Sequence, residues 1–207
     1  MPVRPRGNAR ECWESWCAAH HVGRAVLGAS LASWAGLCAF AAVTIPLKYP
    51  FEARGQVVDS GVVVGVLVPI AVLNVLLDEG PPELVRASAR PLGRERIALA
   101  TVLLVLVAAL SWAVARTAAL PTGLVCCDAL MLQSLTVSGA ALFGGRRGWV
   151  LAAAAAAAMS APGLVPWELD VAYHRDVASG YAAAVALAAV TSTGLYAVRG
   201  ASGLRSR

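Results

Sequence analysis

Long apolar runs, almost free of charged residues, constrain this chain more than any other feature. A transmembrane helix needs about 20 consecutive, mostly apolar residues, and short polar segments divide this sequence into six apolar runs. The expected spans are 24–45, 60–77, 97–115, 123–143, 149–162 and 178–198. The runs lack the two-residue alternation of β-strands, so they indicate helices. The predicted fold class is all-α: a polytopic integral membrane protein with six transmembrane helices and an N-terminal interfacial helix.

The composition supports this class and excludes others. Of the 207 residues, 58% are hydrophobic and 14% are charged, whereas soluble domains carry about 25% charged residues. The net charge of +5 does not indicate a nucleic-acid partner, because the arginines lie between the spans and not in one patch. Five cysteines imply no disulfide framework. Arginine supplies all the positive charge except Lys48, and this bias, with the alanine and glycine content, points to a GC-rich bacterial genome.

Basic residues predict the orientation, because cytoplasmic loops of membrane proteins carry an excess of arginine and lysine. Of the 17 basic residues, 13 fall on one set of alternating loops and tails, and four fall on the other. Both termini, the central loop 78–96 and the basic tail 199–207 are therefore expected in the cytoplasm. The loop 166–177 is expected outside.

The segment 1–23 is predicted to hold an amphipathic helix at the cytoplasmic membrane interface. Asn8 can cap a helix, and Glu11 follows it at the spacing of a capping box. Trp13 and Trp16 then share one helical face, which suits side chains at headgroup depth. The alternative is a simple helical extension of the first span.

The central loop 78–96 is the longest strongly charged interruption of the apolar sequence. Pro82 and Pro91 bracket a run that can form a short helix, since proline is tolerated in the first helical turn. Glu83 and Arg90 would then suit the two ends of the helix dipole. The predicted partner-binding residues are Glu83, Leu84, Arg86 and Arg90. The alternative is an ordinary solvated loop whose arginines only fix the topology.

Asp128 is the one acidic residue well inside an expected span, where ionisable groups usually have a function. Arg116, across a short turn, is its expected partner in an ion pair near the interface. The chain lacks the phosphate-binding motif G-x-x-x-x-G-K-[ST], so any nucleotide hydrolysis needs a separate subunit. We expect no catalytic residue, no cofactor and no metal site.

The loop 166–177 combines Glu168, Asp170 and Asp176 with His174. Three carboxylates and a histidine can bind a cation, but their spacing is not that of any specific ligand set. We interpret this loop as solvated.

The layout resembles that of type-2 ATP-binding-cassette exporter permeases. The text ELVRASARPLGRER is similar to that family's loop pattern: an acidic residue, small and apolar residues, then proline and a basic start to the third span. The resemblance implies that 79–96 contains a coupling helix that docks in a groove of an ATPase. It also implies that 167–176 forms short re-entrant helices that cap the translocation path.

We therefore expect the permease subunit of an ATP-driven exporter that moves an apolar or amphipathic small molecule or peptide across the bacterial cytoplasmic membrane. The implied partners are a separate cytoplasmic ATPase, a second permease in a homo- or heterodimer, and the lipid bilayer. Gly61 and Gly65 form a small-xxx-small notch that favours close helix contact. The alternative is a non-transporting anchoring or assembly protein that binds a cytoplasmic partner through the loop 78–96.

Overall fold

The structure, a computed structural model, describes residues 24–44, 56–79, 92–161, 164–166 and 169–202. The interfacial helix expected in 1–23 lies outside these residues. So do the expected coupling-helix residues Glu83, Leu84, Arg86 and Arg90. Apart from two isolated β-bridges, the regular structure of the described residues is helical, which confirms the all-α class.

Each expected span contains a helix. The elements are α2 (Arg24–Phe40), α3 (Val62–Gly65), α4 (Leu67–Leu73), the 3-10 helix η2 (Asn74–Leu77), α6 (Gly93–Thr117), α7 (Thr122–Phe143), the 3-10 helix η3 (Gly145–Arg147), α8 (Trp149–Ser160), the 3-10 helix η5 (Val171–Tyr173), α9 (Ser179–Arg199) and the 3-10 helix η6 (Gly200–Ser202).

Three helices of the described chain, α6, α7 and α9, are long and apolar enough to cross a membrane. The segments Ala25–Phe40 and Val62–Leu77 are apolar but shorter, and α8 has 12 residues. Lengths and composition are thus consistent with a membrane protein that has three candidate membrane-spanning helices.

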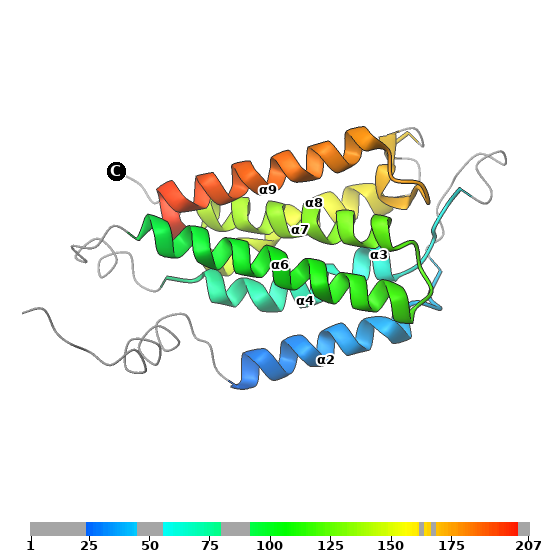
Figure 1. Ribbon diagram of the computed structural model, residues 1–207, viewed down its shortest axis with the longest axis horizontal. Coiled ribbons are helices and arrows are strands. Elements are labelled where there is room, and N and C mark those ends of the chain that lie inside the picture. Colours follow the sequence, from blue (N-terminus) through cyan, green and yellow to red (C-terminus); the bar gives the residue numbers. More distant parts are fainter. Residues whose placement is uncertain (1–23, 45–55, 80–91, 162–163, 167–168, 203–207) are drawn as a thin grey trace, which may run out of the picture.

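The helices lie side by side and alternate in direction along the chain (Figure 1). We call the end of the bundle where η2 and α9 finish and α6 starts the proximal end. The opposite end, where α3 and α9 start and α8 finishes, is the distal end. The η5 turn lies at the distal end (Figure 1).

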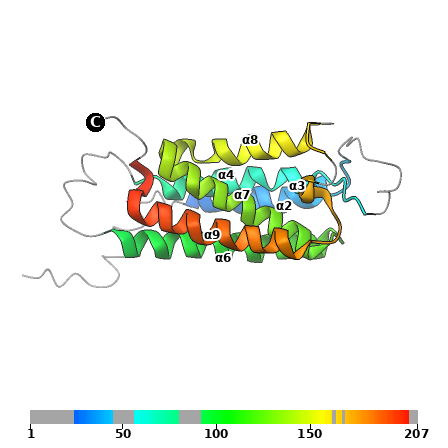
Figure 2. The same cartoon turned by 90° about the horizontal axis from the view of Figure 1, so that it is seen from above.

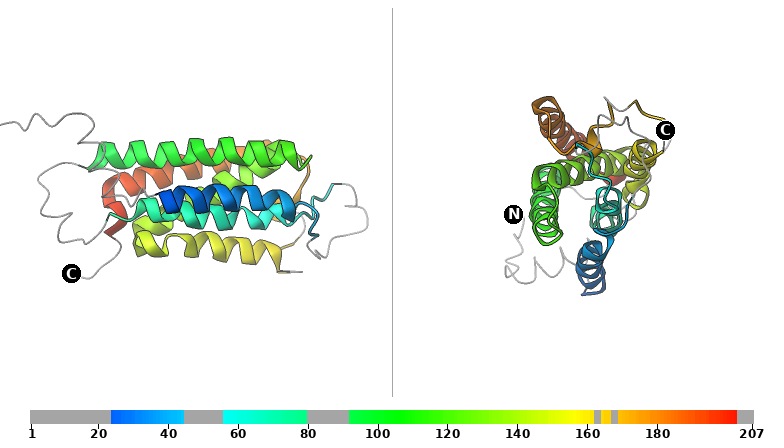
Figure 3. Two further views of the ribbon diagram at one scale, coloured as in Figure 1. Left: turned by 90° about the horizontal axis from the view of Figure 1, so that it is seen from below. Right: turned by 90° about the vertical axis from the view of Figure 1, so that its right-hand side faces the viewer.

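Helix α7 is the centre of the bundle. It packs against α6, α8 and α9 along its length and also contacts α4, and it lies between α8 and α6 when viewed from above or along the axis (Figures 2 and 3). The most apolar stretch of α7 is 67% buried, against 33% for α6 and 17% for α9. The apolar faces that α6 and α9 leave exposed are those expected to meet lipid.

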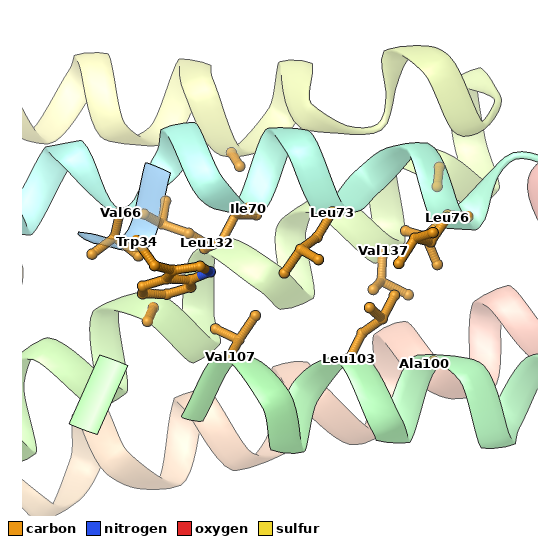
Figure 4. Packing of buried hydrophobic residues seen from close by; sticks show 14 of the residues in the cluster. Trp34, Val66, Ile70, Leu73, Leu76, Ala100, Leu103, Val107, Leu132 and Val137 are labelled. Carbon is orange, nitrogen blue, oxygen red and sulfur yellow. The ribbon is translucent and has the colours of Figure 1, made fainter. Parts of the chain in front are cut away.

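The main core joins α2, α4, α6 and α7 (Figure 4). Ile70 and Leu73 of α4 are fully buried and point toward Leu103 and Val107 of α6. Trp34 brings α2 into this core and is 3% exposed. α2 otherwise lies at the edge of the bundle (Figure 3).

Glycines allow the closest helix contacts. A β-carbon on Gly65 would lie 2.8 Å from a methyl carbon of Leu37 in α2, and one on Gly61 would lie 3.2 Å from the Phe40 carbonyl oxygen. The tightest approach is elsewhere, because a β-carbon on Gly139 in α7 would overlap the carbonyl of Gly148. The turn into α8 therefore needs a glycine at position 139.

We predict that Gly139→Ala destabilises the fold by about 1–3 kcal/mol, the usual cost of forcing extra atoms into a packed core. Gly194→Ala in α9 is the matched control, since a β-carbon there meets nothing within 4 Å and alanine is the better helix former by about 1 kcal/mol. Thermal unfolding of the purified protein in detergent measures both variants. Equal melting temperatures for the two variants would contradict the close packing of α7 on the turn.

Candidate functional site

An apolar cavity of about 230 Å³ lies near the distal end of the bundle. Side chains from α3, α7, α8, η5 and α9 form its wall. Its apolar lining includes Val63, Met131, Leu135, Ala155 and Met159, and its polar lining consists of Asp128, Ser160, Tyr173 and Tyr181. A cavity of this kind, apolar with a few polar groups, is the usual form of a small-molecule site.

Asp128 is the charged residue in this wall. It lies in the second turn of α7 and is only 3% exposed. The Tyr181 hydroxyl, from the first turn of α9, donates a hydrogen bond of 2.6 Å to Asp128 Oδ1. Asp128 Oδ2 is fully buried and has no hydrogen-bond partner among the described residues.

The expected ion pair between Asp128 and Arg116 is wrong. Arg116 lies in the last turn of α6 with its side chain exposed, and the ion pairs found among the described residues are Arg96–Glu79 and Arg146–Asp78. An exposed arginine at a helix end keeps its hydration, so nothing draws it into the bundle. The sequence singled out the buried acid but not its partner, Tyr181.

Two loop segments that pair with each other, which we call the cap, lie at the distal end of the cavity. Val58 N–H donates to the Tyr173 carbonyl at 2.9 Å, and Arg175 N–H donates to the Gln56 carbonyl at 2.6 Å. Tyr173 itself is fully buried, and its hydroxyl lies 2.8 Å from Ser160 Oγ at the end of α8. Burial raises the pKa of the Tyr173 phenol, so it stays neutral. Segments distant in the sequence thus join over the cavity.

Asp170 belongs to this cap and is not solvated as the sequence suggested. It is 7% exposed, and burial raises its pKa from 3.8 to about 6, while the positive charge of nearby His174 acts in the opposite direction. Asp176 is exposed, and Glu168 lies outside the described residues. No group of three potential metal ligands occurs in the described part of the chain.

The resemblance implied short re-entrant helices in 167–176. The described residues of that segment contain one three-residue 3-10 helix, η5, followed by the pairing with 56–58. The pairing of this segment with 56–58 was not visible in the sequence.

Further buried polar atoms lie along α7. Both amide atoms of Gln133 and the hydroxyl of Thr136 are buried and have no hydrogen-bond partner among the described residues. Asp128 and Thr136 are eight residues apart, which places them about 12 Å apart along the helix axis. Unsatisfied polar groups inside an apolar bundle cost free energy, and neither Gln133 nor Thr136 lines the cavity beside Asp128.

A second polar cluster closes the proximal end. Arg96 donates two hydrogen bonds to Glu79, of 2.8 and 2.7 Å, and both side chains are largely buried. Glu79 and Arg96 flank the central loop. Gly200 ends α9 with a φ of 64°, and a side chain there would collide with Arg96. Tyr196 of α9 donates to the Leu77 carbonyl at 3.1 Å.

We call the Glu79–Arg96 pair with Tyr196 and Gly200 the proximal clamp. It ties the end of η2 and the start of α6 to the end of α9. The sequence predicted Glu83, Leu84, Arg86 and Arg90 of the loop as partner contacts and did not predict this clamp. The pairing of Glu79 with Arg96, 17 residues apart, depends on the return of the chain between two helices.

No family model matches this chain, and neither the curated proteins nor the solved structures include a match. The fold and the site therefore define the protein by class alone: the described residues form a helical bundle with three candidate membrane-spanning helices and an apolar cavity near its distal end.

The burial of Asp170 in the cap predicts that the stability of the fold depends on pH. Because Asp170 has a raised pKa of about 6 in the fold, the folded protein binds more protons than the unfolded chain between about pH 4 and about pH 6. Stability should therefore fall as the pH rises through that window. Asp170→Asn should flatten this slope, and Asp176→Asn, the exposed control, should keep it. Melting temperatures of the three proteins against pH measure the effect, and a wild-type slope in Asp170→Asn would contradict it.

Proposed function

We propose that the protein is the permease subunit of an ATP-driven exporter, with the cavity beside Asp128 as its cargo site. The observation that carries the proposal is the capped cavity inside the bundle, with a buried carboxyl in its wall. A protein that served only as an anchor would gain stability by filling this space, because cavities and unpaired buried polar groups both cost free energy.

In this proposal the six helical segments all cross the bacterial cytoplasmic membrane, with α2, Val62–Leu77 and α8 as short spans. The proximal end faces the cytoplasm because the basic residues concentrate on the loops and tails at that end. The cap of 56–58 and 169–175 then closes the cavity on the outer side.

The proximal clamp connects the central loop mechanically to the cavity. Both ends of the loop are fixed to the bundle at the Glu79–Arg96 pair, and α9 joins this pair through Tyr196 and Gly200. A force on the loop would therefore act on α6 and α9 together. Since Tyr181 starts α9 and contacts Asp128, a shift of α9 relative to α7 would alter the cavity.

The proposed cycle is alternating access by a dimer of permeases. A cytoplasmic ATPase docks on Glu83, Leu84, Arg86 and Arg90 of each loop, and nucleotide-driven closure of the two ATPases moves the loops. The cavities then open alternately to the two sides of the membrane. The second candidate, an anchoring or assembly protein, is favoured by the same clamp. A loop whose two ends are fixed to the bundle also suits the binding of a partner that does not move.

The orientation predicts which loops are labelled by a membrane-impermeant thiol reagent. In a background with the five native cysteines replaced by serine, Ser88→Cys in the central loop should resist labelling in intact cells. Arg175→Cys, at an exposed position of the cap, should be labelled readily. Permeabilised cells, in which both should react, are the control. The reverse pattern would contradict the orientation.

Docking of an ATPase on the central loop predicts that reversing the charge of Arg86 weakens the binding of the ATPase. Arg86→Glu should leave membrane insertion intact, because the excess of basic residues on that side stays large. It should weaken binding of the ATPase by about 30-fold or more, since inverting one member of a desolvated interfacial pair costs about 2–5 kcal/mol. Arg147→Glu, an exposed change in the other proximal turn, is the control.

The measurement is co-purification of any ATPase encoded beside this gene, together with ATP hydrolysis in proteoliposomes. Unchanged binding and hydrolysis with Arg86→Glu would remove the coupling role from this loop. A wild-type protein that retains no ATPase would favour the anchoring protein over the exporter.

A further inference from the structure

We propose that the cavity binds an amphipathic organic cation, with the Asp128 carboxylate as its counter-charge. This inference rests on the proposed function for its role in transport, because it names the class of cargo. As a binding property it can be tested on the protein alone.

The first argument is the state of Asp128. The residue is 3% exposed, and an ionised carboxylate at such a position loses its hydration at a large cost in free energy. The Tyr181 hydroxyl satisfies Oδ1, while Oδ2 has no partner among the described residues and the carboxyl belongs to the cavity wall. No described residue therefore offsets the charge that ionisation would place on Oδ2.

The second argument is the sign of the local charge. Asp170 of the cap is an acid whose charge acts on Asp128, and the cavity lining contains no basic residue. Among the basic residues of the distal end, Arg116 and Arg175 have exposed side chains, and the half-buried His174 acts on Asp170 and is not part of the lining. A positive ligand inside the cavity would therefore offset the cost of ionising Asp128, and an anionic ligand would increase it.

The third argument concerns the kind of cation. The wall around the carboxyl consists mainly of valine, methionine, leucine and alanine side chains, which cannot replace the hydration shell of an inorganic ion. A quaternary ammonium group needs no hydrogen-bond acceptors, and aromatic rings such as those of Tyr173 and Tyr181 attract it. An apolar body attached to that group would fill the rest of the cavity.

The experiment uses the wild-type chain in nanodiscs of a zwitterionic lipid, without an ATPase. The probe is phenyltrimethylammonium, and tert-butylbenzene is its neutral isostere of the same shape. Isothermal titration calorimetry measures binding to the wild type, to Asp128→Asn and to the exposed-site control Asp176→Asn. Empty nanodiscs give the correction for partition into lipid.

The wild type should bind the cation, and Asp128→Asn should weaken that binding by about 30-fold or more, as expected for the loss of a buried charge partner. Asp176→Asn should bind like the wild type. Equal affinity of Asp128→Asn and wild type for the cation would overturn the proposal. If Asp128→Asn does not fold, the wild type alone decides: tighter binding of tert-butylbenzene than of the cation would overturn it.

This outcome is independent of the exporter proposal. If cation binding depends on Asp128 but the protein retains no ATPase, the binding site is supported and the ATP-driven role is contradicted. If the protein retains an ATPase but binds no cation, the exporter proposal is supported and this class of cargo is contradicted.

Discussion

Helix α7 is surrounded by α4, α6, α8 and α9, and this arrangement governs what the rest of the bundle can do. Inside an apolar bundle no solvent satisfies polar groups, so a polar side chain on α7 needs a partner from its own helix, from a neighbouring helix or from a bound molecule. Ser134 donates to the Leu130 carbonyl of α7 itself, and Asp128 Oδ1 accepts from Tyr181. Asp128 Oδ2 has no partner among the described residues, and Asp128 belongs to the cavity wall. A molecule bound in the cavity would therefore lie beside this carboxyl.

The two ends of the bundle hold this interior in different ways. At the distal end, backbone pairing of 56–58 with 173–175 and the contact of Tyr173 with Ser160 form the cap beside the cavity. At the proximal end, the Glu79–Arg96 pair and Tyr196 tie three helices to the base of the central loop. Helix α9 carries both Tyr181, which contacts Asp128, and Tyr196 of the proximal clamp, so it links the base of the central loop to Asp128.

The helical segments could be predicted because bilayer thickness and the run of apolar residues together fix where helices lie: the run expected at 97–115 is the core of Gly93–Thr117. The importance of Asp128 could be predicted because a lone acid among apolar residues is conspicuous. Its partner could not, since Tyr181 is 53 residues away and only the packing of α9 on α7 brings it near. The burial of Asp170 likewise depends on a second loop.

Access of water-borne reagents to the cavity from one side of the membrane tests the proposed cargo site most directly. In a cysteine-free background, Met131→Cys places a thiol in the cavity wall, and Leu187→Cys places one on the exposed apolar face of α9. If the cavity is a cargo site, a membrane-impermeant thiol reagent should modify Met131→Cys in right-side-out or inside-out vesicles, while Leu187→Cys, shielded by lipid, should stay unmodified. A Met131→Cys protein that resists the reagent from both sides would contradict a cargo site beside Asp128.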